Sequence, residues 1–144
     1  MVINKRNQKG FTLVEALVVV GIIGVISGVG WHYFTRENYK NKRTEAIAAL
    51  TRIANAFEDC HSDTKTYVGC DNSAGVTAIT GGLQRYAATF VPAPTATTYT
   101  IKLTAIGDQV NDTDCTSMSI DNLGRKTFTG SAQSSVTRCW GSSN

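Results

Sequence analysis

Few residues of this 144-residue chain could do covalent or acid–base chemistry. The four cysteines all lie after residue 59 and are Cys60, Cys70, Cys115 and Cys139. An even number of cysteines in a small domain indicates two disulfides formed in an oxidising compartment. The sequence leaves three pairings open. The most economical of them joins Cys60 to Cys70 and Cys115 to Cys139.

Nucleophilic catalysis would need a base beside a serine or a cysteine, and the chain has only two histidines, His32 and His61. His32 lies at the end of a long apolar run. His61 follows an amphipathic segment, where the dipole of a helix favours a cation near its C-terminus. Cysteines held in disulfides are not nucleophiles. We therefore predict that the protein is not an enzyme, with no catalytic residue and no cofactor.

Two metal sites are conceivable, and the spacing of their ligands favours neither. A zinc site at Cys60, His61 and Cys70 lacks C-x-x-C spacing and a fourth ligand. Asp108, Asn111, Asp112 and Asp114 could offer oxygen ligands to calcium, but no glycine marks the bend and no glutamate follows. We expect no metal site and a polar turn, and calcium near Asp112 and Asp114 stays open, as does glycosylation of the triplet that begins at Asn111.

Glu15 is the only charged residue between Phe11 and Gly30, a run of 20 residues. At 1.5 Å per residue a helix of that length covers about 30 Å, the thickness of the hydrocarbon core of a bilayer. An unpaired carboxylate at that depth costs a few kcal/mol, so Glu15 needs either a partner charge or a place near the interface. The second case would be a simple signal-anchor helix.

The residues before this run do not form an ordinary secretory signal. Basic residues Lys5, Arg6 and Lys9 stand directly before Gly10, and no A-x-A cleavage site follows Gly30. We expect the apolar helix to be kept. Basic residues also follow the run, so the positive-inside rule does not decide the orientation.

The junction Gly10-Phe11 followed by Glu15 resembles that of the type IV pilin family, including its pseudopilin relatives. The resemblance implies that a prepilin peptidase on the cytoplasmic side removes residues 1–10 and methylates the new amino group of Phe11. It also implies that Glu15 pairs with the terminal amine of a neighbouring subunit during filament assembly, which offsets the cost of burying the acid.

Apolar residues continue at helical spacing beyond the run, at Leu50, Ile53 and Phe57, so one helix is expected from about residue 11 to residue 60. Residues 61–94 are rich in Gly, Ser, Thr and Ala and read as a connecting loop with at most one short element. Strands are expected at 97–105, 115–120 and 126–129, the last two joined by a turn at 121–124. The fold class is therefore α+β.

This order of elements resembles type IVa pilins along essentially the whole chain, and most closely the short minor pilins with two disulfides. The resemblance implies the type IV pilin fold, a long N-terminal helix packed on a small antiparallel sheet, and a C-terminal Cys115–Cys139 loop. It divides the chain into a leader (1–10), a transmembrane and filament-core half-helix (11–35) and a periplasmic head (36–144). His32 stands where many type IVa pilins have proline, so we expect the glycines at 24–30 to loosen the helix in a filament.

The net charge of +3 belongs to the leader, which holds three of the 14 basic residues and none of the 11 acidic ones. A neutral mature chain gives little reason to expect nucleic acid as a partner. One local cluster, Arg125, Lys126 and Arg138, could contact DNA, although a solvated hairpin face explains it equally well.

The predicted function is a structural subunit of a type IV pilus, minor or major, in a polymer with other pilin subunits. The resemblance implies a prepilin peptidase and an inner-membrane assembly machinery as partners. It implies a single-pass inner-membrane location before assembly and an extracellular filament afterwards, with roles in adhesion, twitching motility or DNA uptake. A type II secretion pseudopilin and a DNA-binding competence minor pilin are the alternatives.

Overall fold

The computed structural model describes residues 11–131 and 134–141, with the side chains of 29–33 and 35–36 left aside. The predicted leader, including Gly10, lies outside the described residues, as does the side chain of His32. The chain divides into two units, Met1–Glu37 and Asn38–Asn144, which we describe separately. Helix α1 (Leu13–Thr64) begins in the first unit and ends in the second.

In the first unit, Thr12 precedes α1 and its hydroxyl accepts a hydrogen bond from the backbone N–H of Glu15 at 3.2 Å. Thr12 and Glu15 have the spacing of a helix capping box, which explains why the helix begins here. The apolar side chains that follow are exposed, as at Leu13 (77%) and Val25 (70%). No helix among the described residues meets the combined length and apolarity that crossing a membrane requires.

In the second unit, the continuation of α1 buries a stripe of residues at spacings of three and four, namely Arg43, Ala46, Leu50, Ile53 and Phe57. This periodicity gives an amphipathic helix, as the sequence predicts. The helix ends at Thr64, one turn beyond the expected position, with His61 in its last turn.

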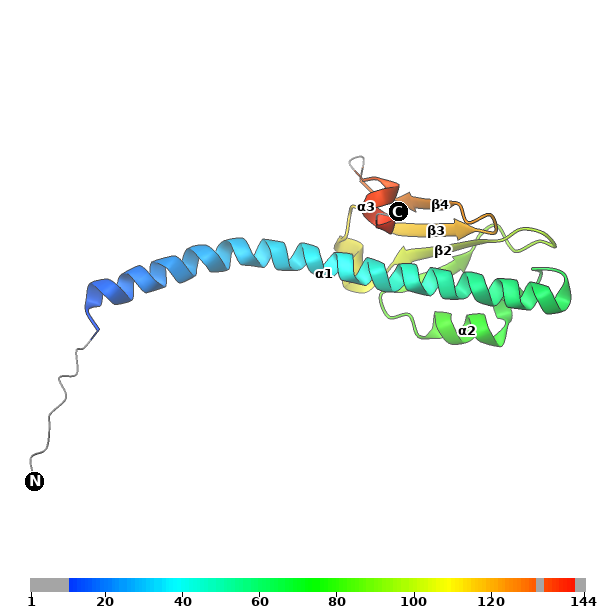
Figure 1. The fold of residues 1–144 in the computed structure, drawn as a ribbon, viewed down its shortest axis with the longest axis horizontal. Coiled ribbons are helices and arrows are strands. Elements are labelled where there is room, and N and C mark those ends of the chain that lie inside the picture. The colour runs from blue at the N-terminus through cyan, green and yellow to red at the C-terminus, as the bar shows by residue number, and fades with distance from the viewer. Residues whose placement is uncertain (1–10, 132–133, 142–144) are drawn as a thin grey trace, which may run out of the picture. The chain divides into compact units, whose positions relative to one another are not determined.

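A four-stranded antiparallel sheet packs on this stripe, in the order β1 (Tyr86–Phe90), β2 (Thr100–Ala105), β3 (Ser117–Asp121) and β4 (Lys126–Thr129). Ile101, Leu103 and Met118 are fully buried on its inner face. The ring centroids of Phe57 on α1 and of Tyr99, the residue before β2, lie 4.7 Å apart. The predicted α+β fold of one long helix and a small antiparallel sheet is confirmed (Figure 1).

The prediction for residues 61–94 is wrong, because this segment contains three elements. They are the 3₁₀ turn η1 (Cys70–Asn72), helix α2 (Ala74–Gly81) and strand β1. Strand β1 exists through its pairing with β2, from Tyr86 opposite Ala105 to Phe90 opposite Ile101. This long-range pairing compensates for the low strand propensity of a sequence rich in alanine. The local pattern of residues therefore does not predict the strand.

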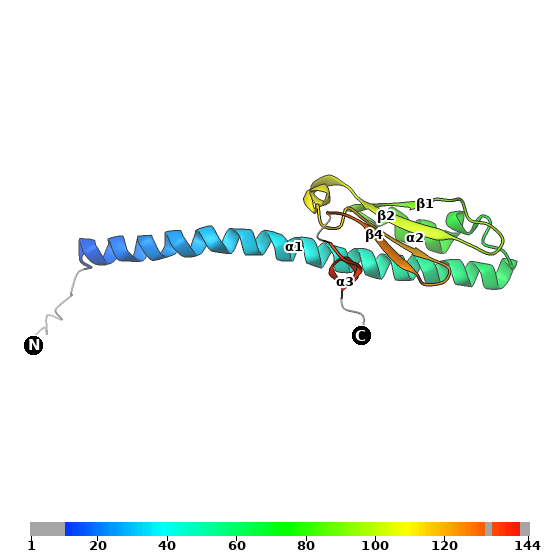
Figure 2. The same ribbon diagram turned by 90° about the horizontal axis from the view of Figure 1, so that it is seen from above.

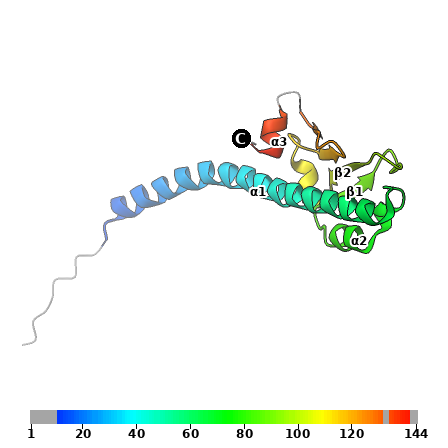
Figure 3. The same ribbon diagram turned by 45° about the vertical axis from the view of Figure 1, so that its right-hand side comes forward.

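The remaining elements are the 3₁₀ turn η2 (Gly107–Asn111), before β3, and the short helix α3 (Val136–Trp140). Helices α2 and α3 lie on opposite sides of α1 in all three ribbon views (Figure 1, Figure 2, Figure 3). Strand β2 begins at Thr100 instead of Thr97, because Thr95 and Thr98 form a turn in which the Thr95 N–H donates to the Thr98 carbonyl at 2.9 Å.

Two disulfides brace the head. Cys60 at the end of α1 is bonded to Cys70, and Cys115 before β3 is bonded to Cys139 in α3. All four sulfurs are therefore used, which removes the thiolates that the zinc alternative would require.

Candidate functional site

Helix α3 has only five residues, so its position depends on contacts with the rest of the head. Ser135 begins it, and the Ser135 hydroxyl accepts the N–H of Arg138 at 3.2 Å, as an N-cap residue does. The Cys115–Cys139 disulfide ties it to β3. The indole Nε1 of Trp140 donates to the carbonyl of Thr127 on β4 at 3.0 Å. A local cap and two attachments to the rest of the head thus fix a helix that would not form alone.

A groove runs between α1 and α3. Its α1 wall includes Lys40, Thr44 and Ile47, and its α3 wall includes Arg138 and Trp140. The lining combines apolar side chains with the cationic side chains of Lys40, Arg43 and Arg138. Such a lining offers charge and hydroxyl donors to an anion.

Arg43 also lines this groove, from the buried stripe of α1, and its charge is paired with Asp112. The Arg43 Nε donates to Asp112 Oδ2 at 2.6 Å and its Nη2 donates to Oδ1, which makes the pair bidentate. Gln109, fully buried, donates from Nε2 to Asp112 Oδ2 at 3.1 Å. Burial opposes the charge on the guanidinium, but the Asp112 carboxylate outweighs burial and raises the pKa of Arg43. Burial, with Asp112 nearby, also raises the pKa of Tyr86 to about 12.

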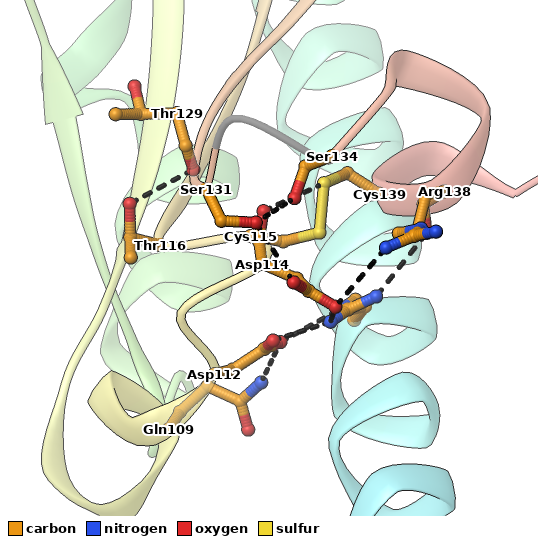
Figure 4. Close-up of polar contacts among 11 residues, drawn as sticks. Gln109, Asp112, Asp114, Cys115, Thr116, Thr129, Ser131, Ser134, Arg138 and Cys139 are labelled. Carbon is orange, nitrogen blue, oxygen red and sulfur yellow. Dashed lines mark hydrogen bonds and ion pairs between the residues drawn. A yellow bond between two sulfur atoms is a disulfide. The ribbon is translucent and has the colours of Figure 1, made fainter.

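Asp114 forms ion pairs with two arginines, Arg43 and Arg138, the second of which is labelled in Figure 4. Its Oδ2 is 3.8 Å from Arg138 Nη1 and 3.9 Å from Arg43 Nη2, while its Oδ1 accepts a hydrogen bond from the Ser131 hydroxyl at 3.1 Å. Arg43 Nη1 also donates to the Arg138 carbonyl at 3.4 Å. The two arginines and two aspartates therefore form one network that links α1, the segment before β3, and α3.

The same network includes Asp112 and Asp114, the two aspartates at which the sequence left calcium open. Both carboxylates face arginines, and Asp108 is 93% exposed, with Oδ2 3.9 Å from Arg85 Nη1. Across residues 11–131 and 134–141, no group of three His, Cys, Asp or Glu side chains could hold a metal ion. These aspartates balance arginine charge within the head.

The three basic residues predicted as DNA contacts fall in two places. Arg125 is in the β3–β4 turn, where its Nε donates to Asp121 Oδ2 at 2.6 Å. Lys126 places its Nζ 5.4 Å from the ring centroid of Trp140, and Arg138 precedes Trp140 by two residues. Lys126, on β4, thus contacts the short helix α3 that carries Arg138, whereas Arg125 is paired with Asp121.

In the first unit, the side chains of Phe11 and Glu15 are both exposed, so that a partner could reach them. Gly10, the other residue of the predicted cleavage junction, lies outside the described residues.

Sequence reasoning missed Lys40, Arg43 and Trp140 as parts of one groove. A signal for Arg43 was present, because it lies one helical step before Ala46 on the buried stripe. A charge in the apolar phase of a helix requires a buried counter-charge. No local signal could have indicated that Asp112, 69 residues away, supplies it.

Two parts of the chain match models of known protein families. Residues 33–119 match the family model described as type IV minor pilin ComP, DNA uptake sequence receptor. Residues 5–31 match the prokaryotic N-terminal methylation motif. The first match covers more than half of the chain and includes α1 from the end of the apolar run through β2 and most of β3.

Three curated relatives align with part of the chain. Fimbrial protein EcpC of Eikenella corrodens is 27% identical over 54% of this chain and 51% of its own length. The type IV major pilin protein PilA of Myxococcus xanthus is 32% identical over 50% of this chain and 32% of its own length. A probable minor fimbrial protein of Dichelobacter nodosus is 29% identical over 55% of this chain and 54% of its own length. The chain thus spans about half, or less, of the relatives it matches.

Proposed function

The chain belongs to the family of type IV minor pilin ComP, the DNA uptake sequence receptor, and from this membership we propose that it is a minor pilus subunit whose head binds DNA. The predicted identity as a type IV pilin, close to the minor pilins with two disulfides, is confirmed. The relatives are fimbrial proteins and a pilin, which favours a pilus over a secretion pseudopilus.

The filament part of the proposal rests on the N-terminal motif at residues 5–31. A prepilin peptidase cuts between Gly10 and Phe11 and methylates Phe11, and residues 11–35 anchor the precursor in the inner membrane. The assembly machinery then moves the subunit into an extracellular filament with other pilins. In that filament Glu15 pairs with the terminal amine of a neighbour, and residues 36–144 form the head. The exposure of apolar side chains along residues 11–28 supports this role, since they gain partners only on association.

The DNA part rests on family membership, and the α1–α3 groove supports it. Arg138 and Lys40 line opposite walls of this groove, and Lys126 places its Nζ over the ring of Trp140, another lining residue. Lysine and arginine bind the phosphates of DNA, and hydroxyl groups such as that of Thr44 assist. The family model ends at residue 119, so the assignment of Lys126 and Arg138 rests on their charge and on their positions at α3.

The test is the affinity of the full chain, in a nonionic detergent, for a fluorescein-labelled DNA duplex, measured by fluorescence anisotropy over a range of salt concentrations. Lys126→Gln and Arg138→Gln should each weaken binding and lower the slope of log affinity against log salt by about one, as expected for one lost phosphate contact. Lys65→Gln is the matched control, because Lys65 follows α1 and its Nζ donates to the Ser62 carbonyl.

An equal loss in all three variants would show that only total charge matters and would reject the groove as the site. If the unaltered chain does not bind the duplex at low salt, DNA binding is rejected and the assignment as a pilin stands without it.

A further inference from the structure

We propose that Asp114 is an internal counter-ion that competes with DNA phosphate for Arg138 and so limits the affinity of the head for DNA. The inference rests on the proposed DNA-binding function and assigns a residue that opposes it. It follows from the difference between the two arginines that share this carboxylate.

Arg43 has a structural role in the head. Its side chain is 8% exposed, it binds Asp112 through two nitrogens, and it donates to the Arg138 carbonyl. Removing it from Asp112 would leave a buried carboxylate without its counter-charge. Arg43 is therefore not available to a ligand.

Arg138 is different, because its side chain is 45% exposed and its one ion pair, among the contacts of the described residues, is with Asp114. The Nη1 to Oδ2 distance of 3.8 Å is beyond hydrogen-bond length. Ion pairs of this kind are weak in water, so a phosphate could take the place of the carboxylate at little cost. The backbone of Arg138 is held by Ser135 and by Arg43, so only its side chain needs to move.

Asp114 is held more firmly, because its backbone is closely surrounded and its carboxylate accepts a hydrogen bond from Ser131. A Cβ on Gly130 would lie 1.7 Å from the Asp114 carbonyl oxygen, so the two backbones are in direct contact. The next residue, Cys115, is in a disulfide, and Ser131 donates to the carboxylate. A phosphate that binds Arg138 therefore approaches a carboxylate that stays in place and repels it.

The experiment measures the affinity of the full chain for the same labelled duplex after Asp114→Asn. We expect binding about twofold to fivefold tighter at low ionic strength, since the pair is partly exposed, and a gain that shrinks as salt screens the charge. Asn keeps an oxygen that can accept the Ser131 hydroxyl. Asp108→Asn is the matched control, because it removes the same charge from an aspartate 3.9 Å from an arginine, Arg85, outside the groove.

The second arm repeats Asp114→Asn in a chain that already carries Arg138→Gln. If Asp114 acts through Arg138, most of its gain disappears in this background. An equal gain with and without Arg138, or an equal gain from Asp108→Asn, would overturn the counter-ion role. Thermal unfolding of each variant establishes that it is folded, and Asp114→Ser replaces Asp114→Asn if the latter is not.

The two proposals fail in distinguishable ways. If the unaltered chain does not bind the duplex at low salt, DNA binding fails and the role of Asp114 fails with it. If the unaltered chain binds and Asp114→Asn has no effect beyond that of Asp108→Asn, DNA binding stands and the role of Asp114 alone is rejected.

Discussion

Burial decides what each charged residue of the head can do. Arg43 and Asp112 are both buried and satisfy one another, so their interaction belongs to the fold. Arg138 and Asp114 have similar chemistry, but they are partly exposed and further apart, so their interaction can be exchanged for another. Within one network, the Arg43–Asp112 pair thus has a structural role and the Arg138–Asp114 pair has a proposed regulatory role.

Gly130 is required by the close approach of its backbone to Asp114. Replacement by alanine would place Cβ 1.7 Å from the Asp114 carbonyl oxygen, so the backbone must shift. We expect Gly130→Ala to lower the free energy of unfolding by about 2–4 kcal/mol, as measured by chemical denaturation.

Gly81→Ala is the control, because no atom lies within 4 Å of the added Cβ and Gly81 ends a helix. Its effect should stay within about 1 kcal/mol and favour the folded state. Equal effects at the two glycines would contradict the steric argument.

Asp121 should contribute stability that depends on pH. Burial opposes its charge, but the N–H groups of Arg125 and Leu123 and the Arg125 guanidinium outweigh burial and lower the pKa of Asp121. A carboxyl whose pKa is lower in the folded state stabilises the fold above its unfolded value and loses this contribution as pH falls through the folded value.

The difference in unfolding free energy between the unaltered chain and Asp121→Asn should therefore be constant above about pH 5 and shrink in more acidic solution. Denaturation curves across this range measure it. Asp108→Asn is the control for removing a carboxylate at an exposed position, and a difference for Asp121→Asn that grows toward acid would contradict the assignment.

At the scale of elements, long-range contacts decide which short segments become ordered. The terminal strand β4 spans Lys126–Thr129 as expected, because a turn of Asp, Asn, Leu and Gly marks where it begins. Strand β1 and helix α2 were not expected, since their sequences are weak and their partners lie elsewhere in the chain. Helix α3 exists through a disulfide and two contacts with the sheet.

The two disulfides should contribute unequally. They span 10 and 24 residues, and on a loop-entropy estimate the longer one contributes roughly 0.8 kcal/mol more. We expect Cys115→Ser with Cys139→Ser to destabilise the head more than Cys60→Ser with Cys70→Ser, as measured by chemical denaturation. Each double variant is the control for the other. The reverse order would show that the 60–70 loop supports more of the core than its length suggests.

At the scale of the whole molecule, the proposed function assigns assembly to the N-terminal segment and recognition to the head. Each part has an unusual feature, namely a long exposed apolar segment at residues 11–28 and a groove lined by cationic side chains. Each feature makes sense when the subunit is one of many in a filament.

Glu15→Ala tests the assembly part. We expect the variant precursor to accumulate normally in cells and to be absent from sheared filaments, because the partner of a neighbouring amine is lost. The hydrogen bond from the residue 15 N–H to the Thr12 hydroxyl uses the backbone and survives the change, so the start of the helix is preserved. Immunoblots of cells and of sheared filaments measure both quantities.

Glu45→Ala is the control, because it makes the same change at an exposed position of the same helix. Normal incorporation of Glu15→Ala into filaments would contradict the proposed pairing.

By itself, the sequence determined the class of the fold, the family and the long helix, because these depend on patterns within short stretches of chain. The motif around Phe11 and Glu15, and the helical spacing from Leu50 to Phe57, are such patterns. Only the tertiary structure decided which charges meet. Arg43 and Asp112 are 69 residues apart, and Asp114 and Arg138 are joined across a disulfide loop. The cause is physical: a local pattern reports the backbone conformation and the buried face, whereas a counter-charge is selected by packing between distant segments.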